Sequence, residues 1–116
     1  MNYNFIDPEY LESVTGNDIS VITEIVNMFK CQIAEFHEEM KLLYSKNEYR
    51  ELGLLAHKAK SSVAIMGMSA LADMLKAFEL SAKESRNAET YEAYIDRFYA
   101  DTQAAVSELN DYLSKK

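Results

Sequence analysis

The chain has little of what disulfides, tight turns and many-stranded folds require. It holds one cysteine, one proline and three glycines in 116 residues. A single cysteine, Cys31, excludes an internal disulfide and a metal site built from several cysteines. So few glycines and prolines leave few tight turns, which disfavours a sandwich or barrel of many short strands. Cys31 stands among apolar residues, and we expect it to be a small core residue.

Positive charge and long apolar runs are also missing. Lys and Arg number 12 against 19 Asp and Glu, a formal net charge of −7, so neither nucleic acid nor an anionic membrane surface is expected as a partner. No run approaches the roughly 18 apolar residues of a membrane span, and no basic and apolar leader opens the chain. We therefore expect a cytoplasmic protein. With 48% hydrophobic residues, we expect a single domain over residues 1–116 with a proper core.

What the chain has is helical periodicity from end to end. Asp7 and Pro8 are a start signal for a short helix over residues 8–14 that ends at Gly16. Asn17 or Asp18 then caps a long helix whose apolar residues step by four and three. Further helices are expected over about 48–66, from a Ser69 cap to a break at 86–87, and over about 88–113. The expected inward stripe of the third helix is Leu52, Leu55, Ala56, Ala59, Val63 and Met66.

Short connections make neighbouring helices antiparallel. The sequence therefore predicts an all-α fold, an antiparallel up-down-up-down four-helix bundle with a short N-terminal helix across one end. A monomer is the default, because no second long apolar seam lies outside the bundle stripes.

One position on the third helix is not explained by packing. At about 100° per residue, His57 falls roughly opposite the inward stripe, with Gly53, Ser61 and Ala64 around it and Lys60 three residues on. Glycine inside a helix lowers stability by about 1 kcal/mol relative to alanine. We therefore interpret Gly53 as a solvent-facing position that leaves open space beside the His57 ring. A neutral imidazole is a good nucleophile, and the Lys60 ammonium could hold phosphoryl oxygens. The pattern favours phosphoryl acceptance by His57.

The residue opposite His57 follows from the hairpin. His57 lies eleven residues before Met68 and Glu79 eleven after it, so an antiparallel pair places both at about the same height. Glu79 could then accept a hydrogen bond from one ring nitrogen, which fixes the tautomer and leaves the other nitrogen free to attack.

Other roles for histidine are weaker. His37 lies among glutamates with no clearing around it, and we interpret it as solvated surface. A di-iron bundle needs Glu three residues before His, but Leu54 and Ala34 stand there, so no metal site is expected.

A spaced motif runs through the third helix and into the fourth, made by Ala56, His57, Lys60, Ser61, Ser62, Gly67, Leu71, Leu75 and Glu79. It resembles the histidine-containing phosphotransfer (HPt) family, which has an Ala-His pair, a Lys three residues after the His, small residues and then Gly ten after the His. The opening 5–11 also resembles the N-terminal helix of that family.

The resemblance implies a phosphoryl carrier without catalytic activity of its own, which shuttles phosphate in a multistep relay between response-regulator receiver aspartates. It implies His57 as phosphoacceptor and Lys60 as the phosphate-side cation, and Glu79 matches a His-orienting Glu of the chemotaxis-kinase branch. Receiver domains and a hybrid sensor histidine kinase would be the partners, with Mg²⁺ supplied by the receiver and no bound cofactor. Ser61 replaces the usual Gly and Ala59 the usual Leu.

Two interpretations are possible both for Leu54 and for the function. Leu54 is apolar but outside the inward stripe, so it either contributes to receiver docking with Gly53, Ser61 and Ala64 or is buried under the N-terminal helix. The alternative function is a helical-bundle adaptor or inhibitor that binds receiver or kinase domains without phosphotransfer.

Overall fold

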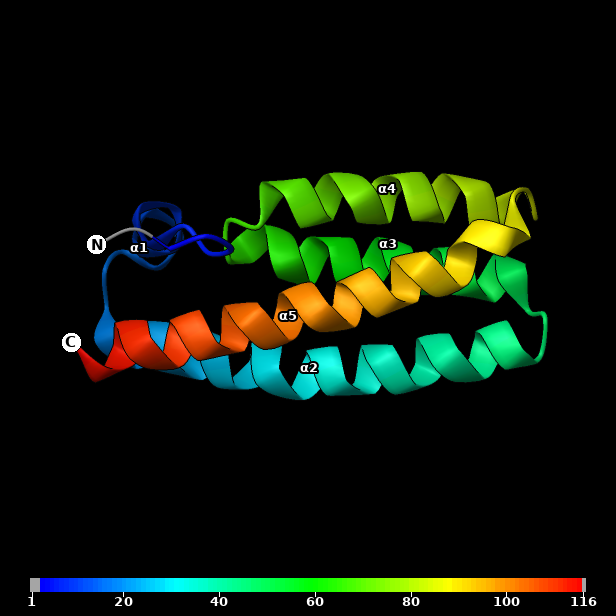
Figure 1. The fold of residues 1–116 in the computed structure, drawn as a ribbon. Coiled ribbons are helices and arrows are strands. Elements are labelled where there is room, and N and C mark those ends of the chain that lie inside the picture. The colour runs from blue at the N-terminus through cyan, green and yellow to red at the C-terminus, as the bar shows by residue number, and fades with distance from the viewer. Residues whose placement is uncertain (1–2, 116) are drawn as a thin grey trace.

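Four long helices run alternately up and down, and a short helix lies across one end of them (Figure 1). The computed structural model describes residues 3–115. Its elements are α1 (Pro8–Thr15), α2 (Ile19–Ser45), α3 (Tyr49–Ile65), α4 (Ser69–Lys83), a 3₁₀ turn η1 (Ala88–Thr90) and α5 (Tyr91–Ser114). The predicted all-α bundle is confirmed.

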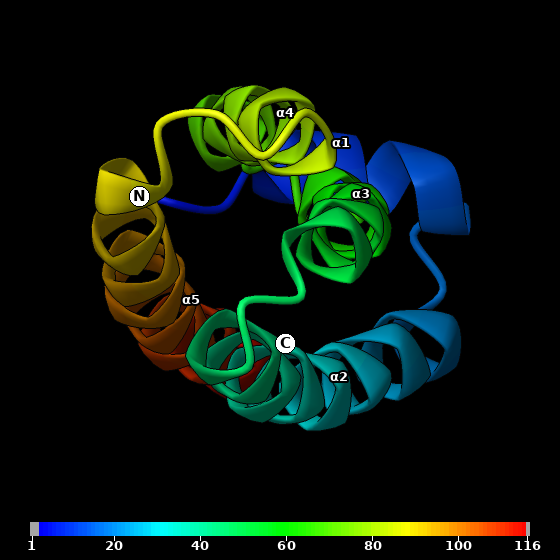
Figure 2. The same ribbon diagram turned by 90° about the vertical axis from the view of Figure 1, so that its right-hand side faces the viewer.

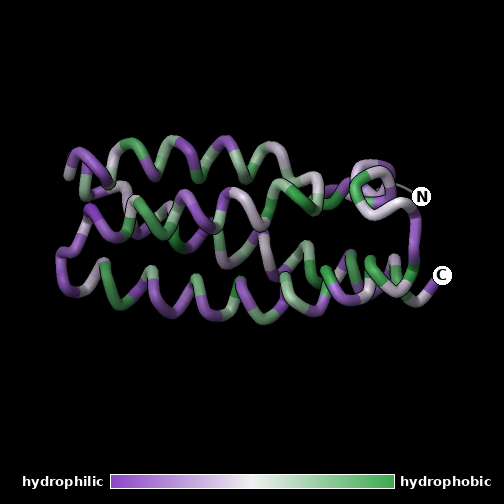
Figure 3. The backbone as a smooth tube through the Cα atoms, turned by 180° about the vertical axis from the view of Figure 1, so that it is seen from behind, coloured by the Kyte–Doolittle hydropathy of each residue, from purple (hydrophilic) through white to green (hydrophobic). Residues whose placement is uncertain are grey.

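The long helices surround a single centre, as the view along the bundle shows (Figure 2). α3 lies between α2 and α4, and α5 closes the ring on the other side. Polar and apolar segments alternate along every helix (Figure 3), because one face of each helix is buried and the other is wet. The largest fully buried side chains are Tyr91, Phe29, Phe78, Phe98, Leu11, Ile22, Met40, Leu52, Met66, Leu75, Leu109 and Val26.

Most helix ends follow the sequence signals, although α4 ends at Lys83, before the expected break at 86–87, and a 3₁₀ turn precedes α5. The Asp7 carboxylate accepts from the Tyr10 amide, and Gly16 closes α1 in a left-handed conformation at φ 68°. Asp18, one of the two expected caps, accepts from the first amides of α2. The prediction of Ser69 as a cap was wrong. Met68 occupies the N-cap without a side-chain hydrogen bond, and Ser69 is already helical.

Two expectations about burial were also wrong. Cys31 is exposed, because it lies between core positions of α2 and so on the outer side of the helix. His37 is half-buried rather than solvated, and its ring stacks on Tyr99 with 4.2 Å between centroids. Burial lowers the pKa of His37, and the nearby Lys41 charge lowers it further.

The loop between α3 and α4 fixes the end of the bundle. Gly67 has φ 77°, and a Cβ there would collide with Asp7. The Asp7 amide donates to the Met66 carbonyl at 3.0 Å. The N-terminal segment therefore packs directly on the α3–α4 loop, beyond which the two helices run side by side to the site described next.

Candidate functional site

His57 stands on the outer face of α3. Its neighbours Leu55, Ala56 and Ala59 are buried in the core, whereas the His57 side chain is 55% exposed. The helical period of the inward stripe thus turns the imidazole outward, as the sequence indicates. The ring is open to another molecule.

The Glu79 carboxylate faces the imidazole from α4. Both of its oxygens lie 3.1 Å from Nδ1 of His57. Unlike the imidazole, the Glu79 side chain is only 8% exposed. The register counted from the hairpin places the two residues together as expected. The exposed imidazole of His57 is therefore hydrogen-bonded to a buried carboxylate.

Two lysines complete a cluster of four groups. Lys83, one turn after Glu79 on α4, donates to Oε2 at 2.8 Å, and Lys60 of α3 lies 3.5 Å from Oε1. Lys60 was expected beside a phosphoryl group, and here it points to the carboxylate. Lys83 was missed by the sequence reasoning, although the four-residue spacing from Glu79 to Lys83 is a recognisable signal for a helical ion pair.

The electrostatics of the cluster keep Glu79 charged. Burial alone would raise the pKa of this carboxyl, but hydrogen bonds from Lys83 and His57, with attraction from the His57 and Lys60 charges, outweigh it. The result is a pKa of about 2 for Glu79. An ionised carboxylate only accepts hydrogen bonds, so Nδ1 of neutral His57 carries the proton and Nε2 carries the lone pair.

The structure corrects the placement of Gly53. The residue is buried, not solvent-facing. A Cβ there would lie 2.8 Å from Cγ of Lys83 and 3.0 Å from both the Glu79 carbonyl oxygen and the Lys83 amide nitrogen. Gly53 therefore allows α3 to approach the turn of α4 that carries Glu79 and Lys83, which is a packing reason for the glycine.

The other predicted docking residues lie on the surface. Ser61 and Ala64 are exposed, and Leu54 is 51% exposed, so Leu54 is not covered by α1. None of these three is drawn into the core. Leu54, Ser61 and Ala64 are thus small or apolar residues that share the exposed side of α3 with His57.

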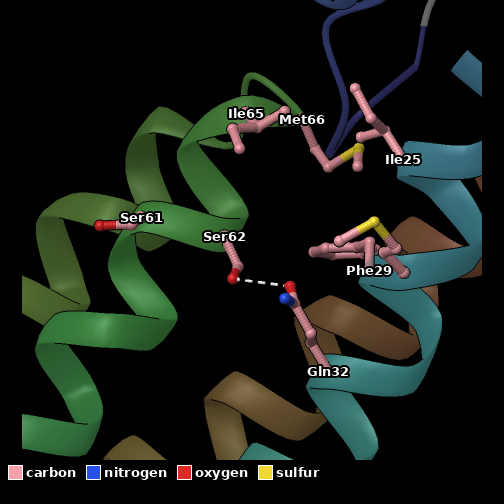
Figure 4. A pocket seen from close by; sticks show the side chains of 8 residues that line it. Ile25, Phe29, Gln32, Ser61, Ser62, Ile65 and Met66 are labelled. Atoms are coloured by element: carbon pink, nitrogen blue, oxygen red, sulfur yellow. Dashed lines mark hydrogen bonds between the residues drawn. The ribbon is translucent and has the colours of Figure 1, made fainter. Parts of the chain in front are cut away.

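A groove of about 170 Å³ separates α2 from α3 beside this surface (Figure 4). The Ser62 hydroxyl of α3 donates to Gln32 of α2 at 3.0 Å, and the exposed side chains of Met28 and Ile65 also line the groove. Ser61 comes from the α3 side, one turn from His57. The groove therefore begins within one helical turn of His57, on the side of α3 towards α2.

The sequence profile of the Hpt domain family matches residues 24–114, which is most of the chain and includes every member of the cluster. The chain belongs to the Hpt domain family. Hpt domains serve in histidine phosphotransfer of two-component phosphorelays and interact with receiver domains and kinases. No curated protein and no solved structure matches the chain in comparisons of either kind.

Two further observations concern the Hpt domain as a whole. Across residues 3–115, no three or more His, Cys, Asp and Glu side chains gather in a way that could hold a metal ion. Within the same part of the chain, none of the helices combines the length and apolarity that crossing a membrane requires.

Proposed function

We propose that the protein is a phosphorelay intermediate that carries a phosphoryl group on Nε2 of His57, between aspartyl phosphates of response-regulator receiver domains. The observation that supports this best is the contrast within one contact. The His57 ring is 55% exposed, yet its Nδ1 is bonded to a carboxylate that is 8% exposed. Such a ring is accessible to a partner and is fixed in orientation before the partner arrives.

The phosphoryl transfer needs only the imidazole of His57 and the aspartyl phosphate as reactants. The Nε2 lone pair attacks the phosphorus of the aspartyl phosphate, an N–P bond forms, and the acyl phosphate O–P bond breaks to release the aspartate carboxylate. The Nδ1 proton stays on the ring, which becomes positively charged. Glu79, already ionised and 3.1 Å away, stabilises that charge, and the reverse step returns the phosphoryl group to a receiver.

Lys60 is the proposed phosphate-side cation. Its contact with Glu79 at 3.5 Å is at the outer limit of a hydrogen bond, and its side chain is 27% exposed. A flexible lysine held this weakly is able to turn to the oxygens of a phosphoryl group on Nε2. The Mg²⁺ that the chemistry needs would come with the receiver, and no cofactor of this chain is part of the proposal.

The proposed docking surface is the outer face of α3 around His57, with Leu54, Ser61 and Ala64, and the edge of the groove towards α2. Exposed apolar side chains beside a small-residue surface suit a partner that must bring an aspartate close to the ring. In the same proposal a hybrid sensor histidine kinase supplies the upstream receiver, the carrier acts as a cytoplasmic monomer, and it has no catalytic activity of its own.

The experiment is transfer of labelled phosphate from a charged receiver, with Mg²⁺ present, across a panel of receivers. Wild-type protein should gain acid-labile, base-stable label, and His57→Gln should gain none. The chain has two histidines, so His37→Gln is the matched control and should be labelled like wild type. Label that persists in His57→Gln would show that His57 is not the phosphorylated residue. Tight receiver binding without label on the wild-type protein would point instead to the adaptor function.

A further inference from the structure

We propose that Lys83 is a positioning residue of the phosphotransfer site. In this proposal Lys83 anchors the Glu79 carboxylate, so that Glu79 keeps His57 oriented while Lys60 is released to the phosphoryl group. The part that concerns Lys60 rests on the proposed function, whereas the part that concerns His57 orientation stands on the resting geometry alone.

The two lysines do not bind Glu79 equally. Lys83 donates to Oε2 at 2.8 Å, a full hydrogen bond, whereas Lys60 lies 3.5 Å from Oε1. The stronger partner is on the same helix as Glu79, and the weaker one is on the helix that carries His57. One lysine is thus placed to stay with the carboxylate and the other to leave it.

A buried carboxylate needs such a permanent partner. Glu79 is almost fully enclosed, and a buried charge left without a cation is strongly unfavourable. The groups that face Glu79 are Lys83 from its own helix and His57 and Lys60 from α3. If Lys60 moves to a phosphoryl group, Lys83 and the Nδ1 proton of His57 remain. Without Lys83, Glu79 would compete with the phosphoryl group for Lys60.

The packing of the two helices leaves room for this arrangement. Gly53 lies on α3 one turn before His57, and the Lys83 side chain passes close to it, with Cγ 2.8 Å from the position that a Cβ of residue 53 would take. The same glycine lets the backbone turn from Glu79 to Lys83 approach α3. Gly53, Glu79 and Lys83 therefore form one packed unit behind the exposed ring.

An ordinary helical ion pair of the same spacing is available for comparison. Lys115 donates to Asp111 at 3.0 Å, also four residues apart, but both side chains are 45% exposed and the pair lies at the C-terminal end of α5, where Lys115 is the C-cap. Lys115→Met removes the same charge and the same kind of pair, so it is the matched control for Lys83→Met.

The first experiment measures transfer from a charged receiver. Lys83→Met should slow labelling of His57 about tenfold, the scale expected when a reacting group loses its orientation, without preventing folding. Lys83→Arg, which keeps a cation at the carboxylate, should restore the rate to within about twofold, and Lys115→Met should behave like wild type. Wild-type rates in Lys83→Met would overturn the proposal, as would an equal loss in both Lys→Met variants.

The second experiment asks whether Lys83 acts through Glu79. In a Glu79→Gln background, Lys83→Met should cause no further loss of rate, because the carboxylate that it anchors is gone. Independent losses that multiply would assign Lys83 a direct role and overturn the positioning role.

A third readout does not depend on phosphotransfer. In His37→Gln protein labelled with ¹⁵N-histidine, only His57 contributes ring signals, and its nitrogen shifts report the tautomer. Lys83→Met should reduce the population with the proton on Nδ1, and an unchanged tautomer would overturn the proposal. If the wild-type protein accepted no label, the proposed function would fail, and this comparison alone would decide whether Lys83 orients the ring.

Discussion

Glu79 presents both carboxylate oxygens to the same nitrogen, Nδ1 of His57, at 3.1 Å each, from a position 22 residues later in the chain. Each oxygen also faces its own lysine, Oε1 towards Lys60 and Oε2 towards Lys83. The carboxylate is therefore held between the imidazole and two cations. Loss of any of these contacts changes the balance of the others, and the variants below separate them.

Replacing Glu79 by Gln should change how the protein responds to acid. The folded-state pKa of Glu79, about 2, is below its ordinary value of 4.5, so its contribution to folding is complete above about pH 4.5 and is lost as the pH falls towards 2. Between these values the free energy of unfolding of wild type should fall by on the order of 2 kcal/mol more than that of Glu79→Gln. Urea unfolding at a series of pH values measures the difference. Parallel curves for the two proteins would show that Glu79 is not the paired carboxylate described above.

Lys60→Ala should separate chemistry from stability. A partly exposed lysine with a weak contact contributes about 1 kcal/mol or less to folding, so the melting temperature should change little. The rate of phosphoryl transfer, or the lifetime of phosphorylated His57, should fall about tenfold, because a charge-assisted contact to the phosphoryl oxygens is removed.

The matched control for Lys60→Ala is Lys41→Ala, which removes an exposed lysine paired with Glu38 on α2. Both variants lower the net charge by the same amount, so only a local effect distinguishes them. Equal transfer rates in the two variants would remove Lys60 from the mechanism.

Gly53→Ala tests the packing of α3 on α4 by the sign of its effect. At an exposed helical site, alanine should stabilise the protein by about 1 kcal/mol relative to glycine. At the observed site the new Cβ would press on backbone atoms of Glu79 and Lys83, and overpacking of this kind costs about 1–3 kcal/mol. We expect a net loss on the order of 1 kcal/mol in urea unfolding. Ser61→Ala, at an exposed position of α3, should show a small gain.

The fold could be predicted because its signals are local and repeated. Asp7, Gly16 and Asp18 mark helix ends through their own side chains or backbone conformation, and the stripes fix which face is buried. The same period places His57 outward, and hairpin symmetry places Glu79 opposite it. These inferences need only the direction of a side chain and the height of a residue along the bundle.

What could not be predicted depends on distances between helices. Gly53 lies on the flank of α3 that faces α4. At such a position, helical periodicity alone does not show whether a residue is exposed to solvent or in close contact with the neighbouring helix. Lys83 matters because Glu79 is buried against α3, which no spacing within α4 reveals. Cys31 is different. Its position two residues from both Phe29 and Ile33 already indicated the outer side of α2, and an apolar neighbourhood was the weaker guide.

Leu54→Asp tests the docking surface, with Leu80→Asp as a matched control. The two leucines are almost equally exposed, at 51% and 53%. Leu54 is on α3, the helix that carries His57, three residues before it, whereas Leu80 is on α4. A charge placed in an apolar contact of a receiver interface should weaken binding about tenfold or more. Calorimetric titration with a receiver measures the affinity, and a thermal melt checks that both variants fold. If Leu80→Asp weakens binding as much as Leu54→Asp, the receiver does not dock on the outer face of α3 as proposed.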